Sequence, residues 1–289
     1  MPANPIVAAT DGSAESLRAV DWAVREAALR DAPLRIVSAA ALMPGMIGSH
    51  AMSGFDAIAE ALRIERDRAL EVAVQRAAGS APGLLIDADA LDGPPAEAVT
   101  HSGRGAQLLV VGSRGRGEFA AMVLGSVSRH VATHASCPVV VVGQDISPAS
   151  RQIGIGIGDT EDAASLTFAF EEAALRQAAL IALHSWHMPD ADFSRAGPIL
   201  SDQPIQHAEQ SEVASRLAEL LDRWRAKYPG VPVSQEVVHG HPGRALVGLS
   251  ARADLVVLGR RPAYHGPAAV THAVLGHAHS PIVTVPAAS

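Results

Sequence analysis

The chain contains very few cysteine, lysine or aromatic residues, and these shortages exclude certain bonds and nucleotide-binding motifs. Cys137 is the only cysteine among 289 residues, so no disulfide can form within the chain, and the reducing cytoplasm is the expected compartment. Because no second thiol could resolve an oxidised one, a small buried residue is a better interpretation of Cys137 than a redox sensor. Lys227 is the only lysine and does not follow a glycine, which excludes a Gly-Lys-Ser/Thr phosphate loop.

Excess positive charge and long apolar runs are lacking as well. The formal net charge is −7, whereas a nucleic-acid-binding protein usually has a basic face, so no nucleic-acid partner is expected. No apolar run is long enough to cross a bilayer, and the first residues lack the basic region of a signal peptide, so no membrane association is expected. The chain does have 48% hydrophobic residues with only 3% aromatics, and its length suits two domains with aliphatic cores.

The stretch with the most chemical information is residues 108–128. Its first aliphatic run, 108–111, predicts a buried parallel strand that ends at Gly112, and open parallel sheets bind ligands at the carboxyl ends of their strands. Glycine allows positive φ and has no Cβ, so backbone N–H groups can approach a phosphate. The predicted phosphate cradle consists of Gly112, Ser113, Arg114, Gly115, Arg116 and Gly117.

A second turn follows nine residues after Gly115. We expect Ser126, preceded by Gly125, to cap a helix that continues through Val127. The N-terminus of a helix directs N–H groups at an anion. A Gly-x-x-Gly turn alone is a weak signal, typical of any tight connection between strand and helix, so the prediction depends on both turns occurring together.

With Gly112, Gly115, Gly125 and Ser126 at these spacings, the chain resembles the universal stress protein family, in the subgroup that binds ATP. The family pattern G-x-x-G, nine residues, G-[S/T] is matched at all four positions. The resemblance implies a doubly wound, Rossmann-like α/β domain with an open, parallel, five-stranded sheet. In this family ATP lies between the loops after the first and fourth strands, and the sequence leaves open whether Mg²⁺ accompanies it.

Asp11 follows the first expected strand, 6–10, and has two interpretations. An aspartate in that place is often only a turn or cap residue. In the family the matching aspartate contacts the nucleoside, so the resemblance implies that Asp11 recognises adenosine. Ser13 is predicted to cap the next helix. Backbone contacts near the nucleoside are expected from Ala9, Thr10 and Ala40.

The other elements of the first half alternate between strand and helix. Aliphatic runs and helical periodicity place strands at 34–39, 84–90 and 139–142, and helices at 14–30, 55–78 and 95–101. The resulting order, βαβαβαβαβ, is typical of a doubly wound sheet.

The second half repeats the first. ADLVVLG, ending at Gly259, copies AQLLVVG, ending at Gly112, with an offset of 259 − 112 = 147 residues. Asp159 copies Asp11 at an offset of 159 − 11 = 148. A period of half the chain indicates two copies of one domain. We expect domains at 1–143 and 152–289, and we expect their final strands, which begin at Pro138 and Pro281, to pair in an internal pseudo-dimer.

The second copy departs from the motif where the phosphates would bind. Pro262 stands in place of the second glycine, and Ala268-Ala269 align with Gly125-Ser126. Proline fixes φ and has no N–H to donate. Arg260 and Arg261 retain positive charge but cannot restore the backbone geometry. We therefore expect a degenerate second site and a single ATP per chain, bound by the first half.

No metal ligands and no catalytic residues are predicted. His239-Gly-His241 and His277-Ala-His279 hint at a metal, but no third ligand has a spacing that requires one, which favours solvated or hydrogen-bonded histidines. No Ser/His/Asp set and no Gly-x-Ser-x-Gly turn is recognisable.

Two main function classes remain. The resemblance implies a non-enzymatic, ATP-binding regulator of a stress response, and the alternative is a slow ATP hydrolase or nucleotidyl-transfer enzyme that uses the same site. An interaction module in which ATP is only structural is a third class. The expected partners are ATP and an unknown regulatory protein, and whole chains are expected to form a homodimer.

Overall fold

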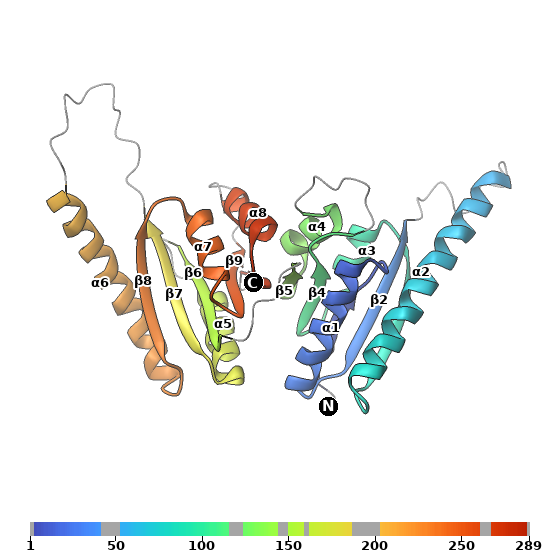
Figure 1. The fold of residues 1–289 in the computed structure, drawn as a ribbon, viewed down its shortest axis with the longest axis horizontal. Coiled ribbons are helices and arrows are strands. Elements are labelled where there is room, and N and C mark those ends of the chain that lie inside the picture. Colours follow the sequence, from blue (N-terminus) through green and yellow to red (C-terminus); the bar gives the residue numbers. More distant parts are fainter. Residues whose placement is uncertain are drawn as a thin grey trace, which may run out of the picture. The chain divides into compact units, whose positions relative to one another are not determined.

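Strands and helices alternate along the chain, which confirms the α/β class (Figure 1). The computed structural model describes residues 3–41, 53–115, 124–143, 150–158, 162–186, 203–260 and 267–287. The elements of the first half are β1 (Ile6–Ala9), α1 (Ala14–Leu29), β2 (Leu34–Ala41), α2 (Ser53–Ser80), β3 (Ile86–Gly93), α3 (Pro95–Ser102), β4 (Leu108–Gly112), α4 (Ser126–His134) and β5 (Val139–Val142). Those of the second half are β6 (Gln152–Ile157), α5 (Ala163–Arg176), β7 (Ala179–Trp186), α6 (Gln203–Lys227), β8 (Val233–His239), α7 (Pro242–Ser250), β9 (Leu255–Arg260), α8 (Pro267–His277) and β10 (Ile282–Pro286).

The chain forms two compact units, and unit 1 comprises residues 1–146 together with 275–286. Its strands lie in the order β3-β2-β1-β4-β5-β10. The first five run parallel, and β1 pairs with both β2 and β4. The strand order therefore reverses between β1 and β4, which is the point at which open parallel sheets bind ligands. Helix α1 packs with α2, and α3 with α4, so helices cover both faces of the sheet.

Burial explains why these aliphatic runs became strands. Every residue of β1, β4 and β5 is buried, as expected for parallel strands covered on both faces. The edge strand β3 has alternating half-buried and exposed residues, and it extends three residues beyond the predicted end at residue 90. Its end is set by pairing with β2, because Ala41 lies opposite Gly93, and that register cannot be read from hydrophobicity.

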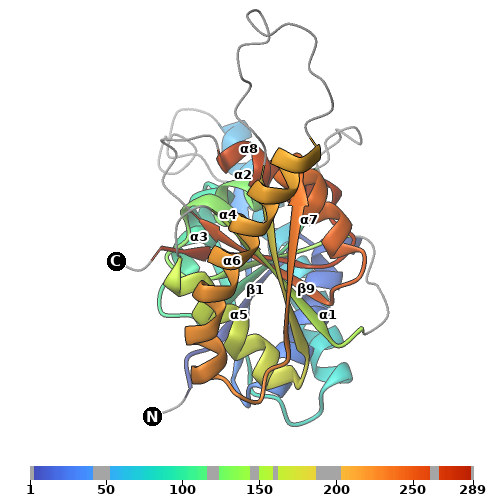
Figure 2. The same ribbon diagram turned by 90° about the vertical axis from the view of Figure 1, so that its left-hand side faces the viewer.

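Unit 2 comprises residues 147–274 with 287–289. Its parallel strands β9-β6-β7-β8 repeat the order of β4-β1-β2-β3, which confirms the internal repeat. Helix α6 runs alongside β8 (Figure 1), and Figure 2, turned by 90°, shows this helix in front of the sheet of unit 2. Added Cβ atoms at Gly154 and Gly156 would lie 2.7 Å and 2.9 Å from Leu249 and Leu246, so these glycines let α7 pack closely against β6. None of the described helices is long and apolar enough to span a membrane.

The final strands of the two repeats pair, as predicted. Strand β10 runs antiparallel to β5, with Ile282 opposite Val141 and Thr284 opposite Val139. The buried hydroxyl of Thr284 donates a hydrogen bond of 2.8 Å to the carbonyl oxygen of Ala132 in α4. The strand that ends the second repeat is therefore part of unit 1.

Candidate functional site

The carboxyl ends of β1 and β4 bring Asp11 and Gly115 together in unit 1. The closeness is evident from the space at Gly115, because a Cβ built there would collide with Oδ2 of Asp11. A glycine is needed at this position to leave room for the carboxylate. Asp11 therefore faces the predicted cradle across the switch point, so two sequence signals about 100 residues apart lie together at one edge of the sheet, which we call the crevice.

Asp11 is held in place by the start of α1. Its Oδ1 accepts hydrogen bonds from the backbone N–H of Ser13 at 3.0 Å and from the Ser13 hydroxyl at 2.6 Å. The Ser13 side chain in turn accepts a bond from the N–H of Ser16, which confirms the predicted helix cap. Gly12 adopts a φ of 79°, the left-handed conformation that glycine allows and that this tight turn requires. The carboxylate is thus oriented by two hydrogen bonds within its own turn.

The side chains of Thr10 and Ser16 support the turn that contains Asp11. Both are buried, and their hydroxyl oxygens lie 3.1 Å apart. The Thr10 hydroxyl accepts from the N–H of Gly12 at 3.1 Å, and Ser16 Oγ accepts from the N–H of Asp11 at 3.3 Å. The Thr10 side chain therefore supports the turn, while the sequence had indicated only a backbone contact at this position.

Of the two properties of glycine considered for the cradle, the lack of a Cβ is the one that Gly112 and Gly115 use. Neither is among the described residues with positive φ. Both leave space for neighbouring atoms. A Cβ at Gly112 would lie 2.9 Å from the backbone carbonyl atoms of Glu15, because the first turn of α1 packs directly on the end of β4.

Helix α4 begins beside the end of β4. Gly125 is the N-cap, with extended φ and ψ of −68° and 152°, and its N–H donates to the carbonyl oxygen of Ser113 at 2.8 Å. The Ser128 hydroxyl donates to the carbonyl oxygen of Gly112 at 2.5 Å. These two bonds join the turns 112–115 and 125–128 into one structure.

The prediction that Ser126 caps this helix is wrong. Ser126 already has helical geometry as the first residue of α4, so the residue before it, Gly125, takes the cap position and has no side chain to offer. Among the described residues no side chain caps α4. Because the first N–H groups of a helix have no partner within the helix, those at Ser126 and Val127 are suited to an anionic ligand.

The remaining residues of the predicted cradle are Arg114, Arg116 and Gly117. Arg114 is half-buried beside Gly125, and its Nε is buried without a hydrogen-bond partner in the described structure. Arg116 and Gly117 lie outside the described residues. Within the described part of this turn, residues 112–115, the positive charge is that of Arg114.

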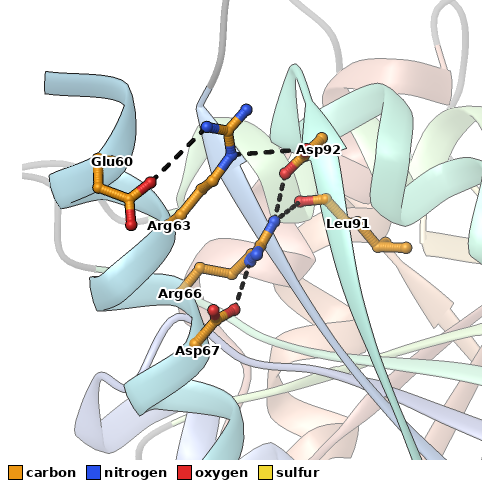
Figure 3. A network of polar contacts seen from close by, with 6 residues as sticks. All are labelled: Glu60, Arg63, Arg66, Asp67, Leu91 and Asp92. Atoms are coloured by element: carbon orange, nitrogen blue, oxygen red, sulfur yellow. Dashed lines mark hydrogen bonds and ion pairs between the residues drawn. The ribbon is translucent and has the colours of Figure 1, made fainter. Parts of the chain in front are cut away.

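The other side of the crevice is formed by the ends of β1 and β2. Ala9 and Ala40 are buried, and Ala40 packs against Ala59 and Leu62 of α2. In the register of the sheet, Ala40 lies opposite Asp92 of β3. Asp92 belongs to a polar network with α2 (Figure 3), which stabilises this edge of unit 1.

The corresponding crevice of unit 2 contains a different charge pattern. Gly259, the counterpart of Gly112, is the next-to-last residue of β9, and an added Cβ there would collide with the carboxylate of Asp162. Asp162 caps α5 and accepts a bond of 2.7 Å from the Ser165 hydroxyl. In unit 2 a carboxylate therefore lies against Gly259, whose counterpart in unit 1, Gly112, is the first residue of the cradle. Asp159 and Pro262 lie outside the described residues, so their predicted roles remain predictions.

Several of the described histidines have structural partners. His241 caps α7 by accepting from the N–H of Gly243 at 3.1 Å, and the ring of His239 packs edge-on against Trp186 at 4.8 Å. On α4, His130 stacks on His134 at 4.2 Å. Burial and the neighbouring His134 lower the pKa of His130, against an opposing effect of Glu97. In the described parts of the chain, no three His, Cys, Asp or Glu side chains are arranged to hold a metal ion.

Sequence reasoning missed the serines that hold the crevice together. Ser16 follows Ser13 by three residues, and Ser128 follows Gly125 by three residues, a spacing typical of the first helical turn. That spacing could have predicted the bond between Ser13 and Ser16, but not the bond from Ser128 to Gly112, 16 residues earlier. Asp162, three residues before Ser165, has the same signature.

The chain is similar to known proteins over nearly its full length. The Universal stress protein family is matched twice, by residues 3–143 and by residues 150–286. Universal stress protein Rv2005c of Mycobacterium tuberculosis is 32% identical over 292 residues, which cover 94% of this chain and 90% of that protein. A universal stress protein of Mycolicibacterium smegmatis is also 32% identical, over 281 residues covering 95% of this chain and 92% of the relative.

A solved structure supports the fold. The crystal structure of a universal stress protein from Archaeoglobus fulgidus aligns with 100% of this chain and 98% of its own, with a TM-score of 0.69. The two sequences are only 14% identical, so this likeness concerns the arrangement of strands and helices alone.

Proposed function

The chain belongs to the universal stress protein family as two tandem copies, and from that premise we propose that unit 1 binds ATP in the crevice between β1 and β4. The bound nucleotide makes the protein a regulator in a stress response and is not a substrate to be turned over. The single observation that carries the proposal is the meeting of Asp11 with Gly115 at the switch point, beside the uncapped start of α4.

The phosphate side of the crevice offers donors with little side-chain obstruction. In this proposal the phosphates lie against Gly112 and Gly115 and accept hydrogen bonds from the first turn of α4, at Ser126 and Val127. The guanidinium group of Arg114 adds a positive charge. A Mg²⁺ ion bound with ATP would be held by phosphate oxygens and water.

The nucleoside side offers a fixed acceptor. Asp11 is oriented by Ser13, and a carboxylate in that position accepts hydrogen bonds from ribose hydroxyl groups. The backbone at Ala9, Thr10 and Ala40 lines the path toward the base. This assignment explains why an aspartate stands at the end of β1, where a turn residue alone could equally have been serine or asparagine.

Two measurements test the proposal. Mass spectrometry of nucleotide released from freshly purified, denatured protein should detect ATP. Radiolabelled ATP incubated with the purified chain should be retained without conversion to ADP, because the proposed role is binding. Steady release of ADP or of a nucleotidyl-transfer product would instead identify an enzyme, and failure to retain any adenine nucleotide would refute ATP binding.

A further inference from the structure

A network of charged side chains joins α2 to β3 in unit 1 (Figure 3). The guanidinium group of Arg66 donates to the carboxylate of Asp67 at 2.8 Å and to the carbonyl oxygen of Leu91 at 3.4 Å, and it forms an ion pair with Asp92. Arg63 adds a longer contact of 3.8 Å to Asp92 and one of 3.9 Å to Glu60. Asp92 is therefore shared by two arginines from successive turns of α2.

This network lies at the nucleoside side of the crevice. Asp92 is the direct register neighbour of Ala40 across the β2–β3 ladder, and Gly93 is the neighbour of Ala41. Strand β3 ends at Gly93, which has a φ of 114°. The ends of edge strands open easily, because a single neighbour holds them. The contact with Arg66 fixes the last residues of β3 and, through them, the end of β2.

Arg66 differs from an ordinary surface arginine. Its side chain is only 10% exposed, whereas its partner Asp92 is 47% exposed. Burial lowers the pKa of Arg66, but hydrogen bonds and charge from Asp67 and Asp92 outweigh that effect and raise it, so the charge is retained. Isolated exposed ion pairs contribute little to the free energy of unfolding. A largely buried guanidinium group that contacts three acceptors instead fixes the positions of those three acceptors relative to one another.

The internal repeat provides a comparison. In unit 2, Trp186 takes the place of Ala40 (186 − 40 = 146) and His239 that of Asp92 (239 − 92 = 147), again as register neighbours. Their rings pack on each other. Where the structure describes both elements, α6 contacts β8 through amide groups, with Gln210 donating to the Val237 carbonyl at 3.4 Å. The arginine–aspartate contact thus occurs in the unit whose glycine turn is intact.

We propose that the Arg66–Asp92 pair positions the nucleoside side of the crevice and thereby sets the affinity for the adenosine part of ATP. The inference rests on the proposed function. Arg66 and Asp92 are positioning residues, which act through the backbone at Ala40. When the pair is lost, the edge adopts its binding geometry for a smaller fraction of the time, and the apparent affinity falls by that fraction.

The test compares two ion pairs on the same helix. Arg66→Ala removes the contact at the crevice, and Asp92→Asn is a second variant that keeps the side-chain shape. Arg76→Ala is the matched control, because Arg76 forms a two-bond ion pair of 2.6 Å and 2.7 Å with Asp21 on α1. Calorimetry on the full chain would measure binding of ATP, adenosine and inorganic tripolyphosphate, and thermal unfolding would check stability.

We expect both crevice variants to bind ATP and adenosine about tenfold more weakly than the unmodified chain, while affinity for tripolyphosphate stays the same. The Arg76→Ala variant should match the unmodified chain for all three ligands, although its melting temperature should fall by a similar few degrees. Equal ATP affinities in the Arg66→Ala and Arg76→Ala variants would overturn the inference. An equal loss for tripolyphosphate would overturn it too, since that indicates general loosening.

The underlying function is tested by the same titrations. If the unmodified chain binds neither ATP nor adenosine, the proposed function fails, and the positioning role fails with it. If the unmodified chain binds ATP and only the comparison of variants is negative, the proposed function stands and the positioning role alone is refuted.

Discussion

Replacement of Gly115 by glutamate is the most direct test of the crevice. A side chain at this position has to start where Oδ2 of Asp11 already lies, so Asp11 must move before any other effect is counted. The new carboxylate also adds negative charge between Asp11 and the proposed phosphate position. We expect the fold to persist, because Gly115 is exposed and the atom that must yield is the end of a side chain.

The size of the effect follows from charge repulsion. Two unit charges about 4 Å apart interact by about 4 kcal/mol at an effective dielectric constant of about 20, which corresponds to about a thousandfold in Kd. Exposure of Gly115 to solvent and salt reduces this, so we expect a loss of about 100-fold or more. The Gly115→Ala variant displaces Asp11 without adding charge and should weaken binding by about tenfold or less.

Isothermal titration of the full chain with ATP would measure both variants. The matched control is Gly230→Glu, which adds the same charge in unit 2 at a turn where nothing lies within 4 Å of the added Cβ. Thermal unfolding of each variant would show that the chain is folded. If Gly115→Glu and Gly230→Glu bind ATP with Kd values within about twofold of each other, the turn after β4 is not the phosphate site.

Four further outcomes are expected. Ser128→Ala removes the bond to the Gly112 carbonyl, so urea unfolding should show a loss of about 1 kcal/mol, and an unchanged midpoint would contradict that contact. Calorimetry of the full chain should give a single ATP per chain, because a carboxylate lies against Gly259, and a stoichiometry of two would refute this. Gly259→Ala should lower the melting temperature, and by less when Asp162 is already replaced by alanine, because the colliding carboxylate is then absent. An equal drop with and without Asp162→Ala would show no collision. The pKa of His130 is lowered from 6.5 in the folded chain, so as the pH falls the unfolded chain protonates this imidazole before the folded chain does. The free energy of unfolding should therefore decrease as the pH falls below about 6.5, and it should decrease less in the His130→Gln variant. An equal pH dependence in the variant and the unmodified chain would contradict this.

Much of the fold and part of the crevice can be predicted from local pattern. Aliphatic runs such as 108–112 identify the strands because parallel strands are buried on both faces, and the repeat offset of 147 residues identifies the second copy. Asp11 and the glycines of the cradle are also visible in sequence, because they follow strand ends. Their proximity in the structure comes from the strand order, which the family resemblance implied and local pattern alone would not have provided.

The details that sequence did not predict depend on contacts between elements. Gly125 is held at the cap position by the hydrogen bond from its N–H to the carbonyl oxygen of Ser113, a residue 125 − 113 = 12 positions earlier. The need for Gly112 arises from the first turn of α1, almost 100 residues earlier in the chain. The pair of Arg66 and Asp92 requires the register of β3 as well as the rotation of α2. None of these contacts can be predicted from the periodicity of hydrophobic residues within one element.

The placement of β10 against β5 has a consequence for synthesis. Strand β5 ends at Val142 and β10 begins at Ile282, so the ribosome adds 282 − 142 − 1 = 139 residues between the two strands. At about 5 to 20 residues per second, this interval lasts about 7 to 28 seconds. During that time the outer edge of β5, a run of four valines, has exposed backbone groups that can pair with a neighbouring nascent chain. The interval before β10 arrives is thus when chains on one polysome are most exposed to mispairing.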